Sequence, residues 1–209
     1  AHSPHDNLRL MRLMKSTRVP TVAFCMGEFG QVSRILAGKF GSPFTYSTFH
    51  ADRSMAPGQM SYQQMKETYR YEKIDHATEV YGVIADPVSH SLSPHIHNAA
   101  FDTLGLNKVY VPIRVRPEDL TQFMHDCREL GIRGLSVTIP HKEAIAKFLT
   151  KVDPAVKGIG AVNTVLFKGE EVLGYNTDYK AAMDCLEGAL GGVVPPGTTS
   201  PLHDKRVLV

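Results

Sequence analysis

The stretch Glu79-Val-Tyr-Gly-Val-Ile-Ala85, followed by Ser91-Leu-Ser-Pro94, decides the fold. Residues 80–85 are short, apolar and rich in β-branched side chains, which is typical of a buried parallel strand. A proline at a helix start then predicts a helix over residues 94–104, and residues 108–114 predict a second strand. Strand, helix and strand in this order predict an α/β fold with a mainly parallel sheet.

Further elements extend this unit toward the C-terminus. We predict helices over 119–130, 141–149 and 178–190, a strand over 134–139, and a hairpin of 161–167 with 171–175. Residues 191–201 are rich in glycine and proline, which predicts a linker, and residues 205–209 predict one new strand. No glycine-rich turn follows that strand, so we expect the sequence to stop inside its architecture.

Residues before 79 show a separate alternation of helices and strands. Asp6 is placed to cap a helix whose apolar face comprises Leu8, Met11, Leu13 and Met14. Residues 19–26 and 43–49 predict short buried strands. Helices are predicted over residues 31–40, ended by Gly41, and over residues 61–71. The alternation is that of βα units, but it starts with a helix rather than with a strand.

Composition excludes several classes of function. With 43% hydrophobic and 21% charged residues, the chain is long enough for one large or two small domains. A net charge of +2 without runs of like charge argues against nucleic acid. Three scattered cysteines fit a reducing cytoplasm, and no apolar run approaches the roughly 20 residues that span a bilayer.

The first polar motif is Ser89-His-Ser-Leu-Ser-Pro94. Hydroxyls and free backbone N–H groups at a helix start suit a carboxylate. The alternative is that Ser93 simply caps the helix, an explanation that leaves Ser91 without a structural role.

The second polar motif is Ser136-Val-Thr-Ile-Pro-His-Lys-Glu143. Thr138 and Lys142 are expected at the carboxyl end of a strand, where open α/β sheets bind ligands. A lysine in the first turn of a helix opposes the helix dipole, although a solvated surface lysine is the commoner explanation.

Two polar clusters bracket the predicted hairpin. Asn163 ends Gly-Ala-Val-Asn, and Thr177 and Asp178 end Gly-Tyr-Asn-Thr-Asp. Amide, hydroxyl and carboxylate groups on one side suit a polyol, while a plain turn and helix cap remains the alternative. His95 and His97 lack the spacing of helical zinc ligands, so we expect no metal.

Together these motifs resemble the shikimate dehydrogenase family over about residues 79–190. The resemblance implies that Ser91 and Ser93 hold the substrate carboxylate, and that polar groups contact the ring hydroxyls. Those groups are Thr138, Lys142, Asn163, Thr177 and Asp178. Lys142 and Asp178 would be the catalytic pair, with either one moving the hydroxyl proton. The family also implies NADP, bound by a Rossmann domain whose site this chain does not contain.

The N-terminal stretch has its own resemblance, to type I 3-dehydroquinate dehydratases, which are (β/α)8 barrels. It rests on four short motifs: Ala23-Phe-Cys-Met-Gly27, Ser33-Arg34-Ile-Leu, Phe44-Thr-Tyr and Ala56-Pro-Gly-Gln59. By that resemblance Arg34 and Gln59 grip the substrate. The family's serine is Met55 here, with Ser54 one place earlier, and its lysine and histidine would precede Ala1, so dehydratase activity is not supported.

We therefore expect three parts: a barrel-like segment over 1–75, a three-layer substrate-binding domain over 76–190, and a linker with the first Rossmann strand over 191–209. The implied function is NADP-linked oxidation of shikimate to 3-dehydroshikimate in aromatic amino-acid biosynthesis, within a dehydratase–dehydrogenase fusion. Alternatives are a quinate/shikimate dehydrogenase, a non-catalytic binding module and a plain scaffold. A partial barrel leaves apolar faces uncovered, which predicts instability or pairing with another chain.

Overall fold

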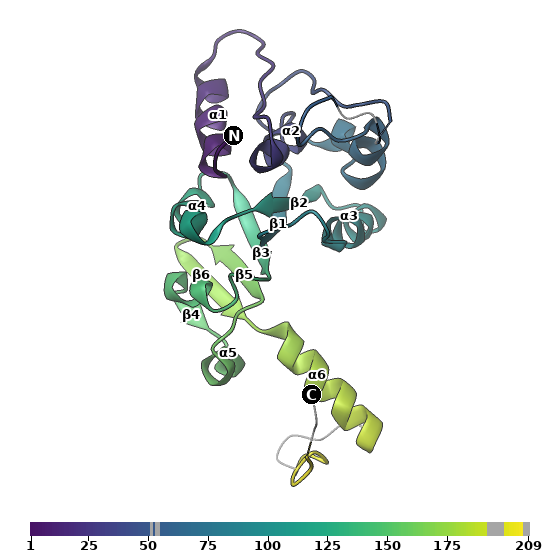
Figure 1. Ribbon diagram of the computed structural model, residues 1–209, viewed down its shortest axis with the longest axis vertical. Helices are drawn as coiled ribbons and strands as arrows, with labels where there is room; N and C mark the ends of the chain where they lie inside the picture. Colours follow the sequence, from purple (N-terminus) through teal and green to yellow (C-terminus); the bar gives the residue numbers. More distant parts are fainter. Residues whose placement is uncertain (51, 53–54, 192–198, 207–209) are drawn as a thin grey trace.

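The computed structural model describes residues 1–50, 52, 55–191 and 199–206. Its centre is a six-stranded sheet in the order β2-β1-β3-β5-β6-β4 (Figure 1). The strands are β1 (Glu79–Ala85), β2 (Lys108–Arg114), β3 (Ile132–Val137), β4 (Lys151–Val152), β5 (Thr164–Lys168) and β6 (Glu171–Tyr175). Strand β1 runs parallel to β2 and β3, and β4 runs parallel to β6, whereas β5 is antiparallel to both of its neighbours. The predicted α/β fold with a mainly parallel sheet is confirmed.

The described residues contain six α-helices. They are α1 (His5–Ser16), α2 (Gln31–Ile35), α3 (Ser93–Thr103), α4 (Leu120–Asp126), α5 (Pro154–Ile159) and α6 (Thr177–Leu190). Shorter helical turns are η1 (Glu28–Gly30), η3 (Gln64–Thr68), η4 (Tyr71–Lys73), η5 (Pro117–Asp119) and η6 (Ala144–Phe148). The predicted helix over 141–149 is thus the short 3-10 turn η6, and the predicted helix over 61–71 contains the π-turn η3.

Alternation along β1 separates two clusters of buried side chains. Val80 and Ile84 face the larger cluster, which also contains residues of α1, α2 and α4. Val83 and Ala85 face a smaller cluster, against which Phe101 of α3 packs. Because successive side chains of a strand point to opposite faces, this short apolar strand contributes side chains to both buried clusters.

The hairpin of β5 and β6 forms as the sequence predicts. The two strands pair from Thr164 opposite Tyr175 to Lys168 opposite Glu171. Gly169 in the connection has a φ of 58°, a conformation that glycine adopts without steric cost.

The two strands predicted over residues 19–26 and 43–49 are absent. These residues form no strand, and their one ladder contact in the described part of the chain is an isolated bridge between Thr48 and Ser61. A parallel strand is stable only beside a neighbour that accepts its hydrogen bonds, and within the described residues no strand precedes β1. The apolar composition of these residues therefore predicted strands, but no neighbouring strand among the described residues pairs with them.

The N-terminal helices are nevertheless covered. Leu8, Met11 and Met14 of α1 are 1–5% exposed and belong to the larger core. The prediction that this segment leaves its apolar faces open is wrong for α1 and α2, because α2 packs against β2 and α1 packs against α2 and α4. Leu13, predicted on the apolar face of α1, is 57% exposed and points away.

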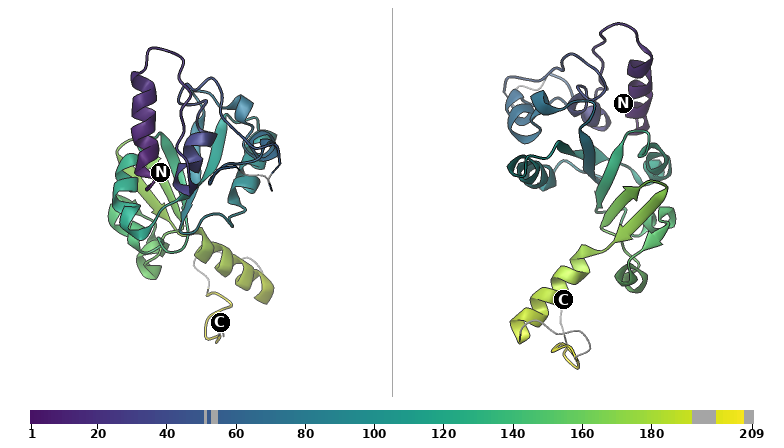
Figure 2. Two further views of the ribbon diagram at one scale, coloured as in Figure 1. Left: turned by 45° about the horizontal axis from the view of Figure 1, so that its top comes forward. Right: turned by 180° about the vertical axis from the view of Figure 1, so that it is seen from behind.

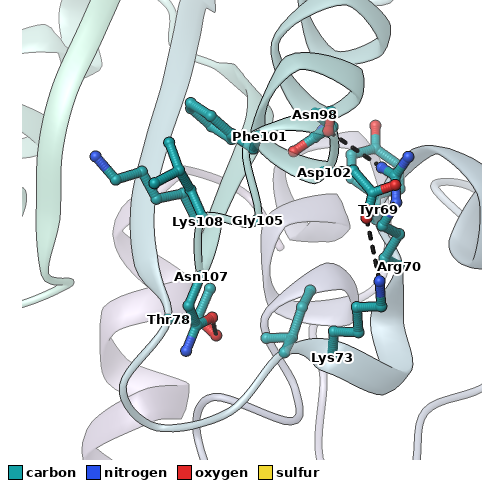
Figure 3. Close-up of a pocket in the computed structure, with 12 residues that line it drawn as sticks. Tyr69, Arg70, Lys73, Thr78, Asn98, Phe101, Asp102, Gly105, Asn107 and Lys108 are labelled. Carbon is teal, nitrogen blue, oxygen red and sulfur yellow. Dashed lines mark hydrogen bonds and ion pairs between the residues drawn. The ribbon is translucent and has the colours of Figure 1, made fainter.

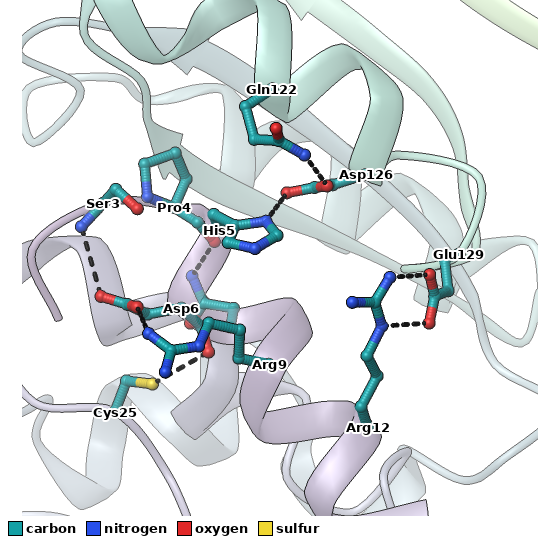
Figure 4. A network of polar contacts seen from close by, with 11 residues as sticks. Ser3, Pro4, His5, Asp6, Arg9, Arg12, Cys25, Gln122, Asp126 and Glu129 are labelled. Atoms are coloured by element: carbon teal, nitrogen blue, oxygen red, sulfur yellow. Dashed lines mark hydrogen bonds and ion pairs between the residues drawn. The ribbon is translucent and has the colours of Figure 1, made fainter.

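Polar pairs fix α1 against α4 and the turn that follows it (Figure 4). The Asp126 carboxylate, which is buried, lies 2.6 Å from His5 Nδ1 and also accepts a hydrogen bond from Gln122. Arg12 donates two hydrogen bonds to Glu129, at 2.8 and 2.6 Å. A bidentate pair of this kind sets orientation as well as contact.

Helix α6 extends away from the sheet (Figures 1 and 2), and none of its residues is buried. The predicted linker and strand of residues 191–209 fall largely outside the described residues, and Lys205 and Arg206 form no strand. Among the residues that the structure describes, no helix is long and apolar enough to cross a membrane.

Candidate functional site

A cavity of about 480 Å³ lies at the carboxyl ends of β1 and β3. Its wall includes every side chain predicted for the dehydrogenase-like site: Ser91, Ser93, Thr138, Lys142, Asn163, Thr177 and Asp178. These residues come from three separate motifs, which the sheet brings together because the carboxyl ends of parallel strands meet at one edge.

The serine side of the cavity is built on the start of α3. Leu92 occupies the cap position, and the Ser91 hydroxyl accepts a 3.3 Å hydrogen bond from the Ser93 backbone N–H. The interpretation of Ser93 as the helix cap is therefore wrong, since Ser93 already lies in the first turn. Ser91 has the local structural role that the sequence did not reveal. Both hydroxyls lie at the positive end of the helix dipole, a setting that suits an anion.

Lys142 is positioned by its buried neighbour. The His141 ring is 1% exposed, and its Nε2 lies 2.7 Å from the Val115 carbonyl oxygen. The Lys142 carbonyl accepts a 2.8 Å hydrogen bond from the Val162 N–H. Because these contacts hold His141 and the Lys142 carbonyl, the backbone of Lys142 is fixed a few residues beyond the end of β3.

The Lys142 ammonium donates a 2.6 Å hydrogen bond to Asp178 Oδ2 at the start of α6. This hydrogen bond lowers the pKa of the Asp178 carboxyl below its ordinary value, against a smaller opposing effect of burial. Asp178 is therefore an anion over the physiological range and holds the ammonium toward the cavity that both residues line.

Asn163 joins the hairpin to α6. Its amide nitrogen donates to the Thr177 hydroxyl at 2.8 Å, and its amide oxygen accepts from the Thr177 N–H at 3.0 Å. Asn176 caps α6 by accepting from the Tyr179 N–H at 3.0 Å, so the helix-cap interpretation is right for Asn176. Thr177 and Asp178, the next two residues, face the cavity instead.

Two residues were missed from the sequence: Ser136, which belongs to the site, and Tyr110, which is buried beside it. Ser136 lines the cavity two places before Thr138, and the period of a strand could have revealed it. The Tyr110 hydroxyl is buried and has no hydrogen-bond partner within the described residues. Burial raises the pKa of Tyr110, while the neighbouring Ser136 and Ser93 hydroxyls act in the opposite direction. Nothing in the local pattern around Tyr110 signals this placement, because β2 and the serine motif meet only in the fold.

The side chains of His90, His95 and His97 do not come together. His97 stacks on the Tyr110 ring at 4.3 Å, His95 contacts the Thr68 hydroxyl at 3.2 Å, and His90 lines the cavity. Among the described residues, no three histidine, cysteine or acidic side chains gather in a way that could hold a metal ion.

The dehydratase-like residues lie elsewhere. Arg34 on α2 is 2% exposed, and its guanidinium lies 4.2 Å from the centre of the Phe24 ring. Burial lowers the pKa of Arg34, and its Nε has no partner within the described residues. The Gln59 amide oxygen accepts from the Met55 N–H at 3.0 Å, and the Met55 side chain is 91% exposed. Ser54 lies outside the described residues.

A smaller cavity of about 250 Å³ opens between η4, α3 and β2 (Figure 3). Asp102 pairs there with Arg70 at 2.8 Å and with Lys73 at 3.1 Å. No residue predicted for either site lines it.

Fold and cavity together define a class, the open α/β domains that bind a small molecule beyond the carboxyl ends of their strands. Within that class, residues 83–165 match the shikimate dehydrogenase substrate binding domain, and residues 1–76 match type I 3-dehydroquinase. The two resemblances predicted from the motifs are confirmed, in the predicted order.

Some relatives resemble both parts of the chain and others resemble the dehydrogenase-like part. A chloroplastic bifunctional 3-dehydroquinate dehydratase/shikimate dehydrogenase of Arabidopsis thaliana is 39% identical over 98% of this chain and 34% of its own length. A shikimate dehydrogenase (NADP(+)) of Geobacter metallireducens is 48% identical over 63% of this chain and 43% of its own length. The chain thus spans less than half the length of these relatives.

Solved structures resemble the sheet domain. A crystal structure of a shikimate dehydrogenase in complex with NADP+ is 46% identical, with a TM-score of 0.54, and covers 57% of this chain and 42% of its own. A shikimate dehydrogenase of Listeria monocytogenes in complex with shikimate and NAD is 40% identical, with a TM-score of 0.52, and covers 56% and 40% of the two chains.

Proposed function

We propose that residues 76–190 bind shikimate for its NADP-linked oxidation to 3-dehydroshikimate, in a protein that joins a dehydratase-like part to a dehydrogenase. The observation that carries this proposal is the Lys142–Asp178 pair, with its 2.6 Å hydrogen bond, in the same cavity as the two serine hydroxyls. An ionised pair and a group of uncharged hydroxyls and amides match a small, ring-shaped carboxylate that carries several hydroxyl groups.

In this proposal Ser91 and Ser93 receive the carboxylate at the start of α3. Thr138, Asn163 and Thr177 form hydrogen bonds to the ring hydroxyls. Shikimate oxidation removes a hydride from carbon and a proton from the attached hydroxyl, and the Lys142–Asp178 pair takes the proton. Asp178 keeps the lysine in place as the charge on the oxygen changes.

NADP supplies the hydride acceptor when bound. No strand followed by a glycine-rich turn and a helix occurs among the described residues, so we assign no residue of this chain to the dinucleotide. The strand proposed for such a domain, residues 205–209, extends beyond the described residues.

We further propose that residues 1–75 derive from the end of a (β/α)8 barrel, with Arg34 and Gln59 as the remnants of an anion-binding site. The Arg34 guanidinium is buried, and its Nε has no hydrogen-bond partner in the part of the chain that the structure describes, which supports this assignment for Arg34. The four sequence motifs of that segment support it for Gln59.

The test is a calorimetric titration of this chain with shikimate, repeated with Lys142→Ala, Asp178→Ala and Lys151→Ala. We expect saturable binding that the first two variants weaken at least tenfold, because each leaves a charge unpaired at the cavity. Lys151 forms a comparable ion pair with Glu171 away from the cavity, so its variant should bind as the wild type does. Equal affinities in all four proteins would contradict the assignment.

A further inference from the structure

One arginine joins the N-terminal segment to the wall of the shikimate cavity. Arg114 ends β2, and its Nε donates a 2.8 Å hydrogen bond to Asp86. Its Nη1 donates to the carboxylate of Glu28 in η1. The planar guanidinium therefore engages two carboxylates that lie 58 residues apart in sequence, which a lysine could not do in the same geometry.

Asp86 begins the serine segment, residues 86–93, which carries the cavity residues Ser91 and Ser93. The Asp86 N–H donates to the Ile139 carbonyl at 3.3 Å, and the Ser91 N–H donates to the Val88 carbonyl at 3.1 Å. Pro87, Val88 and His90 also line the cavity. Val88 packs with Tyr110 of β2 in the smaller buried cluster, and the Asp86 carboxylate adds a polar link between the segment and the end of β2.

Glu28 belongs to the part of the chain that carries the dehydratase-like residues. The preceding Gly27 N–H donates to the Pro57 carbonyl at 3.0 Å, just before Gln59. Gly58 is packed so closely here that an added Cβ would lie 2.2 Å from the Gly27 carbonyl oxygen. Phe29 extends the contact, because its ring lies 5.1 Å from the Arg114 guanidinium. Glu28 is thus fixed to the loop that ends at Gln59.

We propose that Arg114 is a positioning residue that couples η1 and residues 57–59 to the serine segment. A change in the packing of Glu28 moves the Arg114 guanidinium and so alters its hydrogen bond to Asp86. Movement of Asp86 in turn shifts Ser91 and Ser93. The importance of that position for shikimate rests on the function proposed above, whereas the mechanical coupling does not. Coupling of this kind is reciprocal, so a ligand that orders the serine segment also orders η1.

The first experiment measures amide hydrogen exchange in the unliganded chain, for the wild type, Glu28→Gln and Glu72→Gln. Glu72 is an exposed glutamate within residues 1–75, the part of the chain that also contains Glu28, and serves as the matched control. We expect the Asp86 and Ser91 amides to exchange about two- to fivefold faster in Glu28→Gln, the range measured for partly exposed ion pairs, and at the wild-type rate in Glu72→Gln. Unchanged exchange in Glu28→Gln would overturn the coupling.

A double-mutant cycle separates coupling from local damage. If Glu28 acts through Arg114 on Asp86, then Glu28→Gln adds nothing to Asp86→Asn, and the two effects are not additive. Independent, multiplying effects would refute the relay. Shikimate affinity, measured on the same variants, should fall with the same pattern. If Glu28→Gln exchanges faster than the wild type but the wild-type protein binds no shikimate, the proposed function is contradicted and the coupling still holds.

Discussion

At the scale of single residues, the Lys142–Asp178 pair makes a prediction about pH. The hydrogen bond from Lys142 lowers the pKa of the Asp178 carboxyl, so the folded-state value lies below the unfolded value of about 3.9. The contribution of this pair to stability is therefore complete above about pH 3.9 and is lost as the pH falls through the lower, folded-state pKa.

Replacing Lys142 by methionine should return the pKa of Asp178 toward its ordinary value. The measurement is an NMR titration of the side-chain carboxyl carbons. Glu171, whose pKa is lowered mainly by its hydrogen bond from Lys151, is the internal control and should titrate alike in both proteins. A pKa of Asp178 that stays low in Lys142→Met would show that another group holds the carboxylate.

At the scale of elements, one asparagine attaches α3 to the edge of the sheet. Asn98 is 4% exposed; its amide donates to the Tyr110 carbonyl and accepts from the Tyr110 N–H, both at 2.8 Å. Strand β2 is an edge strand, so without this side chain its outward backbone groups would have no partner at this point.

We expect Asn98→Ala to destabilise the fold by about 1–3 kcal/mol for each backbone group left unpaired. Urea unfolding measures the loss. Thr103→Ala on the same helix is the control, because Thr103 is exposed and its hydroxyl bonds only within the helix, to Ala99. Equal stability of the two variants would mean that water replaces the asparagine amide.

Predictability from the sequence differs between elements for a physical reason. The hairpin of β5 and β6 and the strand β1 were predicted because each finds its hydrogen-bond partner among neighbouring elements of the same unit. Residues 19–26 have an equally apolar pattern but no adjacent strand, so they remain unpaired. Hydrophobic pattern records the tendency to be buried, whereas a sheet also requires a neighbour.

At the scale of the whole molecule, the two parts share one core. Met11 of α1 is 2% exposed and packs in the same cluster as Ile84 of β1 and Phe123 of α4. We therefore expect Met11→Ala to lower the free energy of unfolding by about 2–5 kcal/mol, the usual cost of a core cavity. Leu13→Ala, on the exposed side of the same helix, should change it by less than about 0.5 kcal/mol.

Unfolding followed by far-ultraviolet circular dichroism and by tyrosine fluorescence should give a single, coincident transition for both variants. An earlier, separate transition of the N-terminal segment would show that α1 does not share the stability of the sheet. The contacts of His5 with Asp126 of α4 and of Arg12 with Glu129 in the following turn predict the shared transition as well.

The sequence by itself determined the α/β class, the strands β1, β2 and β3 with the hairpin of β5 and β6, and the polar motifs beside the ends of these strands. These follow from local periodicity and from residue types whose chemistry does not depend on distant partners. Only the tertiary structure decided that residues from three motifs line one cavity, that Asn98 covers the edge of β2, and that Arg114 joins Glu28 to Asp86. Each of these depends on contacts between residues far apart in the chain, which are fixed by the packing of the sheet and its helices rather than by any local pattern.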